Sequence, residues 1–203
     1  EGLKTLERVV KFVRETNPKL ILIGDAKRGD ISSSMERYAK SIYEQWDFDA
    51  ATVNPFAGRD SIDPFLQYED KGVFVWCKSS NPDGYQFQNI GDTTRNGNGK
   101  VYEMIAREAN DWNFNKNVGL VVGATYPNEL DSIRQISPDI PILVPGIGSQ
   151  DGDLRASIVG GISPSRYNLI ISSSRSIIYA SDNPVDYGMA AGMAAKKLKN
   201  QVN

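Results

Sequence analysis

Six short apolar runs recur along the chain and set the strongest limit on its fold. Each run is continuously apolar rather than alternating, which is typical of strands buried on both faces. Helix-like stretches separate the runs, and such alternation predicts an α/β fold with a parallel sheet. The sheet is either open and doubly wound or closed as a (β/α)8 barrel. The runs are residues 20–24, 50–53, 73–77, 118–122, 142–144 and 168–171.

The stretches around these runs predict helices. The first is amphipathic from Leu3 to Val13 and ends near Asn17, because the residue before a proline disfavours helical dihedrals. Ser33 and Glu36 form a capping-box pattern at the start of the next helix. The last helix is rich in alanine and closes with lysines, which suit a helix C-terminus. The later predicted helices span residues 34–46, 99–112, 127–135, 153–160 and 185–198.

The number of runs decides between the two sheet architectures. No Gly-x-Gly-x-x-Gly pattern follows the first run, which disfavours an open dinucleotide-binding sheet. A barrel needs eight strands and typically about 250 residues, whereas this chain has 203 residues and opens inside a helix without an initiator Met. We therefore expect a single TIM-barrel domain over residues 1–203, incomplete at the N-terminus, with about six strands, the third to the eighth.

Composition restricts the chemistry and the partners. The chain has no histidine, which excludes a His-based triad and the usual zinc sets. Its single cysteine, Cys77, excludes an intramolecular disulfide and is expected to pack in the core. A net charge of −2 gives no bulk attraction to nucleic acid or acidic membranes. No stretch approaches the roughly 20 apolar residues of a membrane span. We expect a cytoplasmic enzyme with no nucleic-acid or membrane partner.

Three charged residues follow the first apolar run: Asp25, Lys27 and Asp30. Because strand side chains alternate, Asp25 and Lys27 are predicted to point the same way. Two carboxylates around one ammonium would hold it as a fixed cation that can donate a proton or stabilise an anion. The alternative is structural, with Asp30 capping the next helix and Asp25 pairing with Lys27. We favour a site, because active sites form at the C-terminal ends of such strands.

Two loops after the last two runs predict an anion site. The first, residues 145–150, contains glycines that allow close backbone approach to a ligand, and it leads into a helix whose N-terminal amides favour an anion. The second ends in Arg175, a suitable bidentate phosphate partner. Each loop alone could be a glycine turn or a surface arginine. After the middle run, Ser80 could bind a planar amide edge, although Ser-Asn-Pro is by itself only a turn signal.

Taken in order, these motifs resemble the orotidine 5′-monophosphate decarboxylase family, in its longer, second type. The family's Asp-x-Lys-x-x-Asp-Ile motif is present at residues 25–31. The resemblance runs from about Lys19 to Tyr179. It implies a TIM-barrel lyase that converts orotidine 5′-monophosphate to uridine 5′-monophosphate with no metal or cofactor. Further matching motifs lie at residues 52–56, 77–82, 122–124, 145–150 and 174–179.

The resemblance also implies roles for the charged cluster. Lys27 would give a proton to C6 of the pyrimidine, and Asp25 would lie beside the substrate carboxylate. Asp30 would join the same charge network from across the interface of a homodimer with shared active sites. Ile31 and Ser34 would accompany Asp30 into the partner's site, with Ser34 standing where the family commonly has Thr.

The substrate-binding roles implied by the resemblance fall on the later loops. Ser80 would meet the pyrimidine amide edge, and Pro145 would lie beside the base. Gln150 and Arg175 would hold the phosphate of the nucleotide, and Gln150 would also help to close a loop over it. The family further uses an Asp after its first strand and a Lys after its second. Neither region is found in these residues, so we expect the chain as given to be an incomplete catalyst.

Other functions remain open at this point. A related phosphosugar decarboxylase or aldolase would use Asp25 and Asp30 to help hold Mg²⁺, since such enzymes carry a related first motif. A non-catalytic nucleotide-binding remnant would bind uridine monophosphate without turnover. A purely structural subunit would bind no nucleotide.

Overall fold

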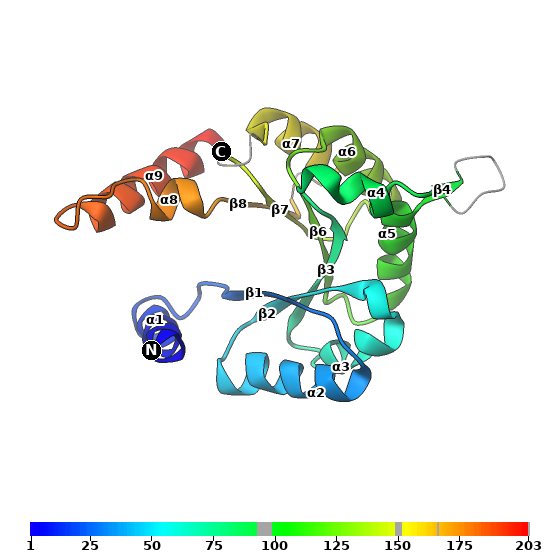
Figure 1. Cartoon of the computed structure of the whole chain (residues 1–203), viewed down its shortest axis with the longest axis horizontal. Helices are drawn as coiled ribbons and strands as arrows, with labels where there is room; N and C mark the ends of the chain where they lie inside the picture. Colours follow the sequence, from blue (N-terminus) through cyan, green and yellow to red (C-terminus); the bar gives the residue numbers. More distant parts are fainter. Residues whose placement is uncertain (93–98, 149–151, 166, 203) are drawn as a thin grey trace. The chain divides into compact units, whose positions relative to one another are not determined.

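The computed structural model of the chain describes all residues except 93–98, 149–151, 166 and 203 (Figure 1). Six strands follow the order β1-β2-β3-β6-β7-β8 in one sheet. The pairs β1–β2, β2–β3, β6–β7 and β7–β8 are parallel. All six predicted strands are therefore present, five of them within one residue of the predicted bounds; the first is displaced from residues 20–24 to Ile23–Arg28, so it contains Asp25 and Lys27. Their bounds are β1 (Ile23–Arg28), β2 (Ala50–Val53), β3 (Gly72–Lys78), β6 (Val118–Val122), β7 (Ile142–Pro145) and β8 (Leu169–Ser172).

Helices connect these strands, and the long ones except α2 lie close to the predicted ranges. They are α1 (Gly2–Thr16), α2 (Ser32–Lys40), α5 (Val101–Trp112), α6 (Pro127–Ile136), α7 (Leu154–Gly161) and α9 (Tyr187–Val202). Short helical segments complete the connections: η1 (Ser41–Gln45), η2 (Pro55–Ala57), η3 (Arg59–Ser61), α3 (Asp63–Leu66), η4 (Pro82–Gly84), α4 (Tyr85–Gln88) and α8 (Arg175–Ile178). Within the described part of the chain, no helix is both long enough and apolar enough to cross a membrane.

The chain divides into two compact units, Glu1–Trp76 with Ala109–Gly119, and Cys77–Glu108 with Leu120–Asn203. In the first unit, α2 and α3 lie along β1 to β3 (Figure 1). Val53, Val73 and Phe65 are fully buried there. These apolar side chains carry no polar atoms, so their burial drives the packing of helices on the strands.

The predicted helix at 34–46 starts earlier than expected. It begins at Ser32 and continues beyond Lys40 as the π-helical segment η1. Its N-cap is Ile31, whose side chain makes no capping hydrogen bond. The predicted capping box is wrong, because Ser33 already lies inside the first helical turn, where its side chain cannot serve as the N-cap.

In the second unit, α6 and α7 pack against each other beside β7. Gly161 ends α7, and a Cβ there would lie 2.7 Å from Leu169 Cδ1, so only glycine allows this close approach to β8. Cys77 is fully buried, as expected, and its thiol donates to the carbonyl of Tyr102 at 3.1 Å. Burial raises the pKa of this thiol, which suits a packing role.

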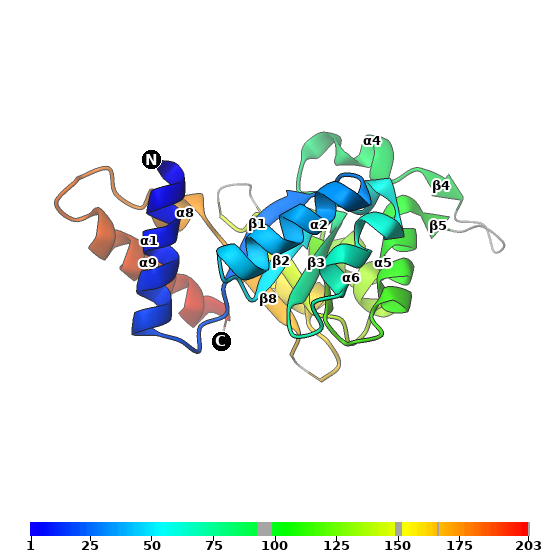
Figure 2. The ribbon, with the colours of Figure 1, turned by 90° about the horizontal axis from the view of Figure 1, so that it is seen from below.

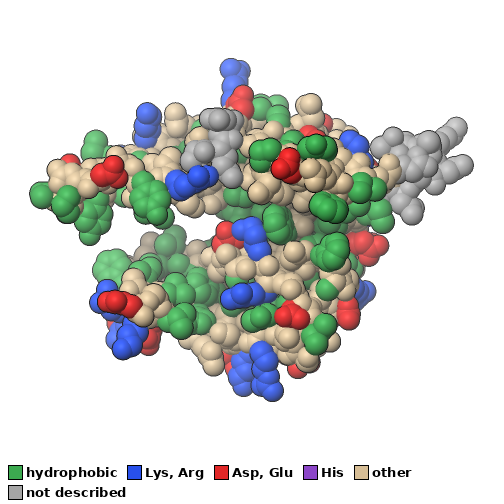
Figure 3. All heavy atoms as spheres, viewed as in Figure 1, with side chains coloured by type: hydrophobic (Ala, Val, Ile, Leu, Met, Phe, Trp, Pro, Cys, Tyr) green, Lys and Arg blue, Asp and Glu red, His purple; other side chains and the backbone are tan. Residues whose placement is uncertain are grey.

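Two features of the second unit were not predicted. Strands β4 (Gly91–Asp92) and β5 (Gly99–Lys100) form an antiparallel hairpin that projects beside α4 and α5 (Figure 2). The C-terminal segment also carries exposed hydrophobic side chains, as Figure 3 shows on α8 and α9. They include Ile178, Tyr179, Val185, Tyr187, Met189 and Met193.

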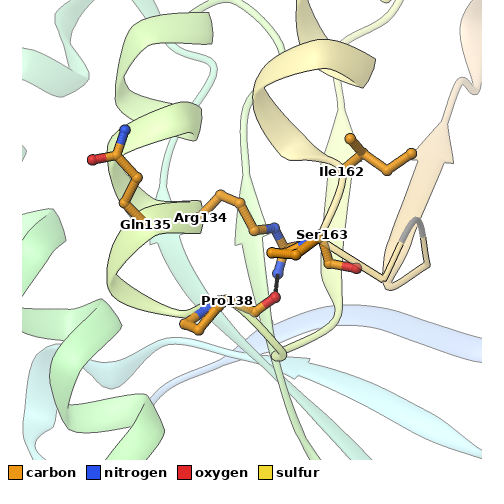
Figure 4. A pocket seen from close by; sticks show the side chains of 6 residues that line it. Arg134, Gln135, Pro138, Ile162 and Ser163 are labelled. Atoms are coloured by element: carbon orange, nitrogen blue, oxygen red, sulfur yellow. Dashed lines mark hydrogen bonds between the residues drawn. The ribbon is translucent and has the colours of Figure 1, made fainter.

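A buried arginine secures the N-terminal ends of β7 and β8. Arg134, on α6, is only 6% exposed and lines a pocket with Gln135, Pro138, Ile162, Ser163 and Pro164 (Figure 4). Burial lowers the pKa of its guanidinium to about 10, against an opposing effect of Asp139, so it stays charged at neutral pH. Its nitrogens donate to the carbonyls of Gly161, Ser137, Pro138, Ile140 and Asn168, at 2.8–3.1 Å.

We expect Arg134→Met to lower the free energy of unfolding by about 3 kcal/mol, because several buried carbonyls lose a charged donor. Urea denaturation followed by circular dichroism measures this loss. Arg134→Lys keeps a charge but lacks the planar set of donors, so we expect an intermediate loss. An unchanged denaturation midpoint for Arg134→Met would show that these hydrogen bonds add nothing to stability.

Candidate active site

A β-bulge in β1 brings Asp25 and Lys27 together. From Gly24 to Arg28 the strand advances four residues, while its partner advances only two, from Ala51 to Val53. Lys27 adopts a positive φ of 45° inside this bulge, a conformation that costs an ordinary residue about 1 kcal/mol or more. Its Nζ lies 2.5 Å from Asp25 Oδ1. The predicted pair is formed, but through an irregular strand and not through simple alternation.

Thr52 joins both residues of this pair and was not predicted as a site residue. It is fully buried in the middle of β2. Its hydroxyl accepts a hydrogen bond from the Lys27 backbone N–H at 2.9 Å and donates one to Asp25 Oδ1 at 2.9 Å. A threonine within an apolar buried strand must find such partners. Its presence in the run 50–53 was the available signal.

Asp30 does not complete a two-carboxylate clamp within the chain. Among the ion pairs of the described residues, Lys27 is joined to Asp25 and not to Asp30. Asp30 is exposed, and its Oδ1 accepts from the Ile31 N–H at 2.7 Å. Ile31 is 67% exposed, and Ser34 lies half-buried in the first turn of α2. Of the two carboxylates predicted to surround the Lys27 ammonium, only that of Asp25 contacts it within this chain.

The loop that carries Asp30 is held against the end of β2. Asn54 N–H donates to the carbonyl of Arg28 at 2.6 Å. A Cβ on Gly29 would lie 2.8 Å from Asn54 Cβ, so a side chain there would force the loops apart. The Arg28 guanidinium also lies over the ring of Tyr38, 4.6 Å from its centroid. These contacts fix the backbone that follows the bulge, at Arg28 and Gly29.

In the second unit, the loop after β3 carries Ser80. Its carbonyl accepts from Thr125 Oγ1 at 3.2 Å. A Cβ on Gly123 would lie 2.5 Å from Ser80 N, so only glycine allows the end of β6 to lie so close. Ser80 is half-buried. The sequence therefore places this serine on a loop whose backbone is constrained by the neighbouring strand.

The two loops predicted to form an anion site lie together in the second unit. Pro145 ends β7, and its carbonyl accepts from Ala124 N–H at 2.9 Å. Gly146 and Gly148 have positive φ values of 102° and 87°, which glycine alone adopts freely. Ser173 Oγ, from the loop after β8, donates to the carbonyl of Ile147 at 2.9 Å.

The two residues predicted to hold the phosphate are only partly described. Arg175 is exposed at the start of α8, and Gln150 lies outside the described residues. At the start of α7, Asp153 Oδ1 accepts from Ala156 N–H at 3.0 Å. The protein's own carboxylate thus caps an amide that the sequence suggested for a bound anion. Among the described residues, no group of three or more Cys, Asp or Glu is placed to hold a metal ion.

Comparison with known proteins identifies the family. The model of the orotidine 5′-phosphate decarboxylase / HUMPS family matches residues 1–189. The chain belongs to this family. Orotidine 5′-phosphate decarboxylase from Azoarcus sp. (strain BH72) is 44% identical over 201 residues, which cover 98% of this chain and 72% of that protein.

Solved structures agree with this assignment. OMP decarboxylase of Leishmania donovani is 35% identical with a TM-score of 0.80, covering 97% of this chain and 74% of that one. UMP synthase of the same organism is 36% identical with a TM-score of 0.82, covering 100% of this chain and 43% of that one. The predicted TIM-barrel fold, with six parallel strands in this chain, is confirmed. The relatives do not favour the phosphosugar alternative.

If Lys27 is catalytic, as the sequence predicts, we expect Thr52→Val to reduce kcat about 10- to 100-fold, because the ammonium would lose its alignment with the reacting atom. The Lys27 N–H would also lose its buried acceptor, at a cost of about 1–3 kcal/mol in stability. Steady-state kinetics and thermal unfolding measure both effects. Thr52→Ser keeps the hydroxyl and serves as the matched control, with kcat close to that of the unmodified enzyme. Equal kcat values for the two variants would show that the hydroxyl does not orient the pair.

Proposed function

We propose that this chain decarboxylates orotidine 5′-monophosphate to uridine 5′-monophosphate and that Lys27 is its proton donor. Family membership supports the reaction. The Asp25–Lys27 pair supports the assignment of Lys27, since its ammonium is held at the end of a parallel strand by the Asp25 carboxylate. In this architecture that strand end is where catalytic groups gather.

The reaction breaks the bond between C6 and the carboxylate, and carbon dioxide leaves. The bonding electron pair stays on C6 in the plane of the ring, where the pyrimidine π system cannot delocalise it. The Lys27 ammonium stabilises this carbanion and transfers a proton to C6, forming a C–H bond. Lys27 then regains a proton from solvent. The ammonium interacts more strongly with the localised carbanion than with the more dispersed starting carboxylate, and this difference lowers the barrier.

Asp25 and Thr52 fix the ammonium before the charge develops. One carboxylate oxygen of Asp25 accepts from both Lys27 Nζ and Thr52 Oγ1. Because these groups are already oriented, little reorganisation is needed during bond breaking. We assign Asp25 to the position beside the substrate carboxylate.

The remaining assignments concern substrate binding. Ser80 meets the amide edge of the pyrimidine, Pro145 lies beside the base, and Gln150 and Arg175 hold the phosphate. The close packing of the loops after β7 and β8 supports this division of roles. Because the phosphate is remote from C6, its binding energy can serve loop closure and exclusion of water.

We also propose a homodimer in which Asp30, Ile31 and Ser34 reach the partner's active site. Asp30 is exposed and does not pair with Lys27 of its own chain, and Ile31 beside it exposes 67% of its surface. A carboxylate and an apolar side chain presented together suit a contact with a second copy. The cofactor-free chemistry and the cytoplasmic location stay predictions.

We expect Lys27→Ala to reduce kcat about 1000-fold or more, because the general acid and the cation are both lost. Uridine monophosphate should still bind, since phosphate and base contacts remain. Product formation followed by ultraviolet absorbance and binding followed by calorimetry test the two expectations. Lys40→Ala, which removes an exposed lysine of α2, is the control. Near-normal turnover by Lys27→Ala would remove Lys27 from the mechanism.

Mixing two inactive variants tests the shared site. In a mixed dimer of Lys27→Ala and Asp30→Ala, one site carries both changes and the other carries neither. Random exchange of subunits should therefore restore about one quarter of the native activity. A mixture that stays inactive would place Asp30 in the site of its own chain.

A further inference from the structure

A second lysine is buried at the end of β3. Lys78 has no solvent exposure, which is rare for a lysine unless it is paired. Its Nζ donates to Asn89 Oδ1 at 2.6 Å and lies 4.5 Å from the centroid of the Tyr126 ring and 5.6 Å from that of Tyr102. Among the described residues, its partners are thus an amide and two aromatic rings, with no carboxylate within ion-pair distance.

Burial lowers the pKa of Lys78. The carboxylate of Glu129 opposes this effect, and the ammonium of Lys100 adds to it. Keeping a cation in this position therefore costs folding free energy, since an apolar side chain would avoid the desolvation. Because stability alone does not explain this lysine, its role follows from the elements that its ammonium contacts.

The elements that carry the two main partners of Lys78 also bind the loop that contains Ser80. Asn89 directly follows α4, whose Gln88 Oε1 accepts from the Ser79 N–H at 3.1 Å. The hydroxyl of Tyr126 donates to the carbonyls of Asn81 at 2.9 Å and Pro82 at 3.1 Å. Lys78 thus lies between the two elements that hold the loop from either side.

The loop itself is short and internally bonded. Ser79 is 5% exposed. Its hydroxyl donates to Asn81 Oδ1 at 2.6 Å and accepts from the Asn81 N–H at 2.9 Å. Thr125 binds the carbonyl of the intervening Ser80. Movement of either supporting element would therefore shift the serine as part of a rigid turn.

We propose that Lys78 is a positioning residue for pyrimidine recognition, fixing the loop of residues 79–82 by binding Asn89 on one side and the Tyr126 ring on the other. This inference rests on the proposed role of Ser80. Lys78 is fully buried, so it acts through the loop and does not touch the base. A displacement of about 0.5 Å is enough to weaken a directed hydrogen bond to a ligand.

Arg134 provides a matched comparison. It is also a buried cation of this unit, but carbonyl partners of its guanidinium lie at the N-terminal ends of β7 and β8. If buried cations serve only stability, Lys78→Met and Arg134→Met should change ligand binding equally. If Lys78 positions the loop, only its replacement should alter recognition of the base.

The experiment measures the affinities of the enzyme for uridine monophosphate, cytidine monophosphate and ribose 5-phosphate by calorimetry, together with kcat and KM. The two nucleotides differ in the amide edge that Ser80 is proposed to read, and the sugar phosphate lacks a base. We expect Lys78→Met to weaken the binding of uridine monophosphate about tenfold. The enzyme's preference for uridine monophosphate over cytidine monophosphate should also fall. Ribose 5-phosphate should bind within about twofold of normal, and KM should rise more than kcat falls.

The controls separate the possible failures. Arg134→Met should leave all three affinities unchanged, and Lys78→Arg, which keeps a cation, should recover part of the preference. Asn89→Leu removes the acceptor of Lys78 and tests the same contact if Lys78→Met does not fold; an unchanged preference in that variant overturns the inference. If Ser80→Ala leaves the preference unchanged, the proposed role of Ser80 is wrong. If Ser80→Ala lowers the preference and Lys78→Met does not, the inference on Lys78 alone is overturned.

Discussion

The candidate site in the first unit depends on one hydrogen-bonded ion pair. Lys27 and Asp25 meet because β1 bulges against β2, and the bulge is secured by the buried hydroxyl of Thr52. A regular strand would satisfy the Lys27 N–H in the sheet ladder and would not need a threonine. The positive φ of Lys27 shows that the backbone accepts an unfavourable conformation to place the ammonium. Strain of this kind is expected where position matters more than local stability.

Most of the secondary structure could be predicted from the sequence because burial dictates it. The four central strands, β2, β3, β6 and β7, are almost entirely buried, and a sheet covered on both sides accommodates such apolar runs. The outer strands β1 and β8 are more exposed. The irregular features were missed because they depend on tertiary contacts. No hydrophobic pattern in the sequence marks the bulge in β1. The hairpin of β4 and β5 has strands of only two residues each, which are too short to show a pattern. The early start of α2 likewise depends on the extended backbone of Ile31.

The candidate site was predictable where several unusual residue types stand together. Asp25, Lys27 and Asp30 attract attention as charges at the end of an apolar run, and the glycines of residues 146–148 do so as a turn. Thr52 and Lys78 stand in no such cluster: the only sign of Thr52 is a hydroxyl within an apolar run, and a lysine at the end of a strand is ordinary until its burial is known. The pairing of Asp25 with Lys27 was predicted correctly, but its cause was not, because alternation along a strand says nothing of a bulge.

The second unit contains two cations whose burial costs desolvation free energy, and we assign them different roles. Arg134 and Lys78 are both buried cations whose pKa values are lowered by desolvation. Arg134 recovers this cost through carbonyl oxygens that close two strand connections, so its value lies in stability. Lys78 has one amide oxygen and two ring faces, which bind a cation less strongly than a set of carbonyls. Stability alone does not account for a lysine in that place. The geometry it imposes on the loop after β3 does, because a directed contact with a planar base tolerates little displacement.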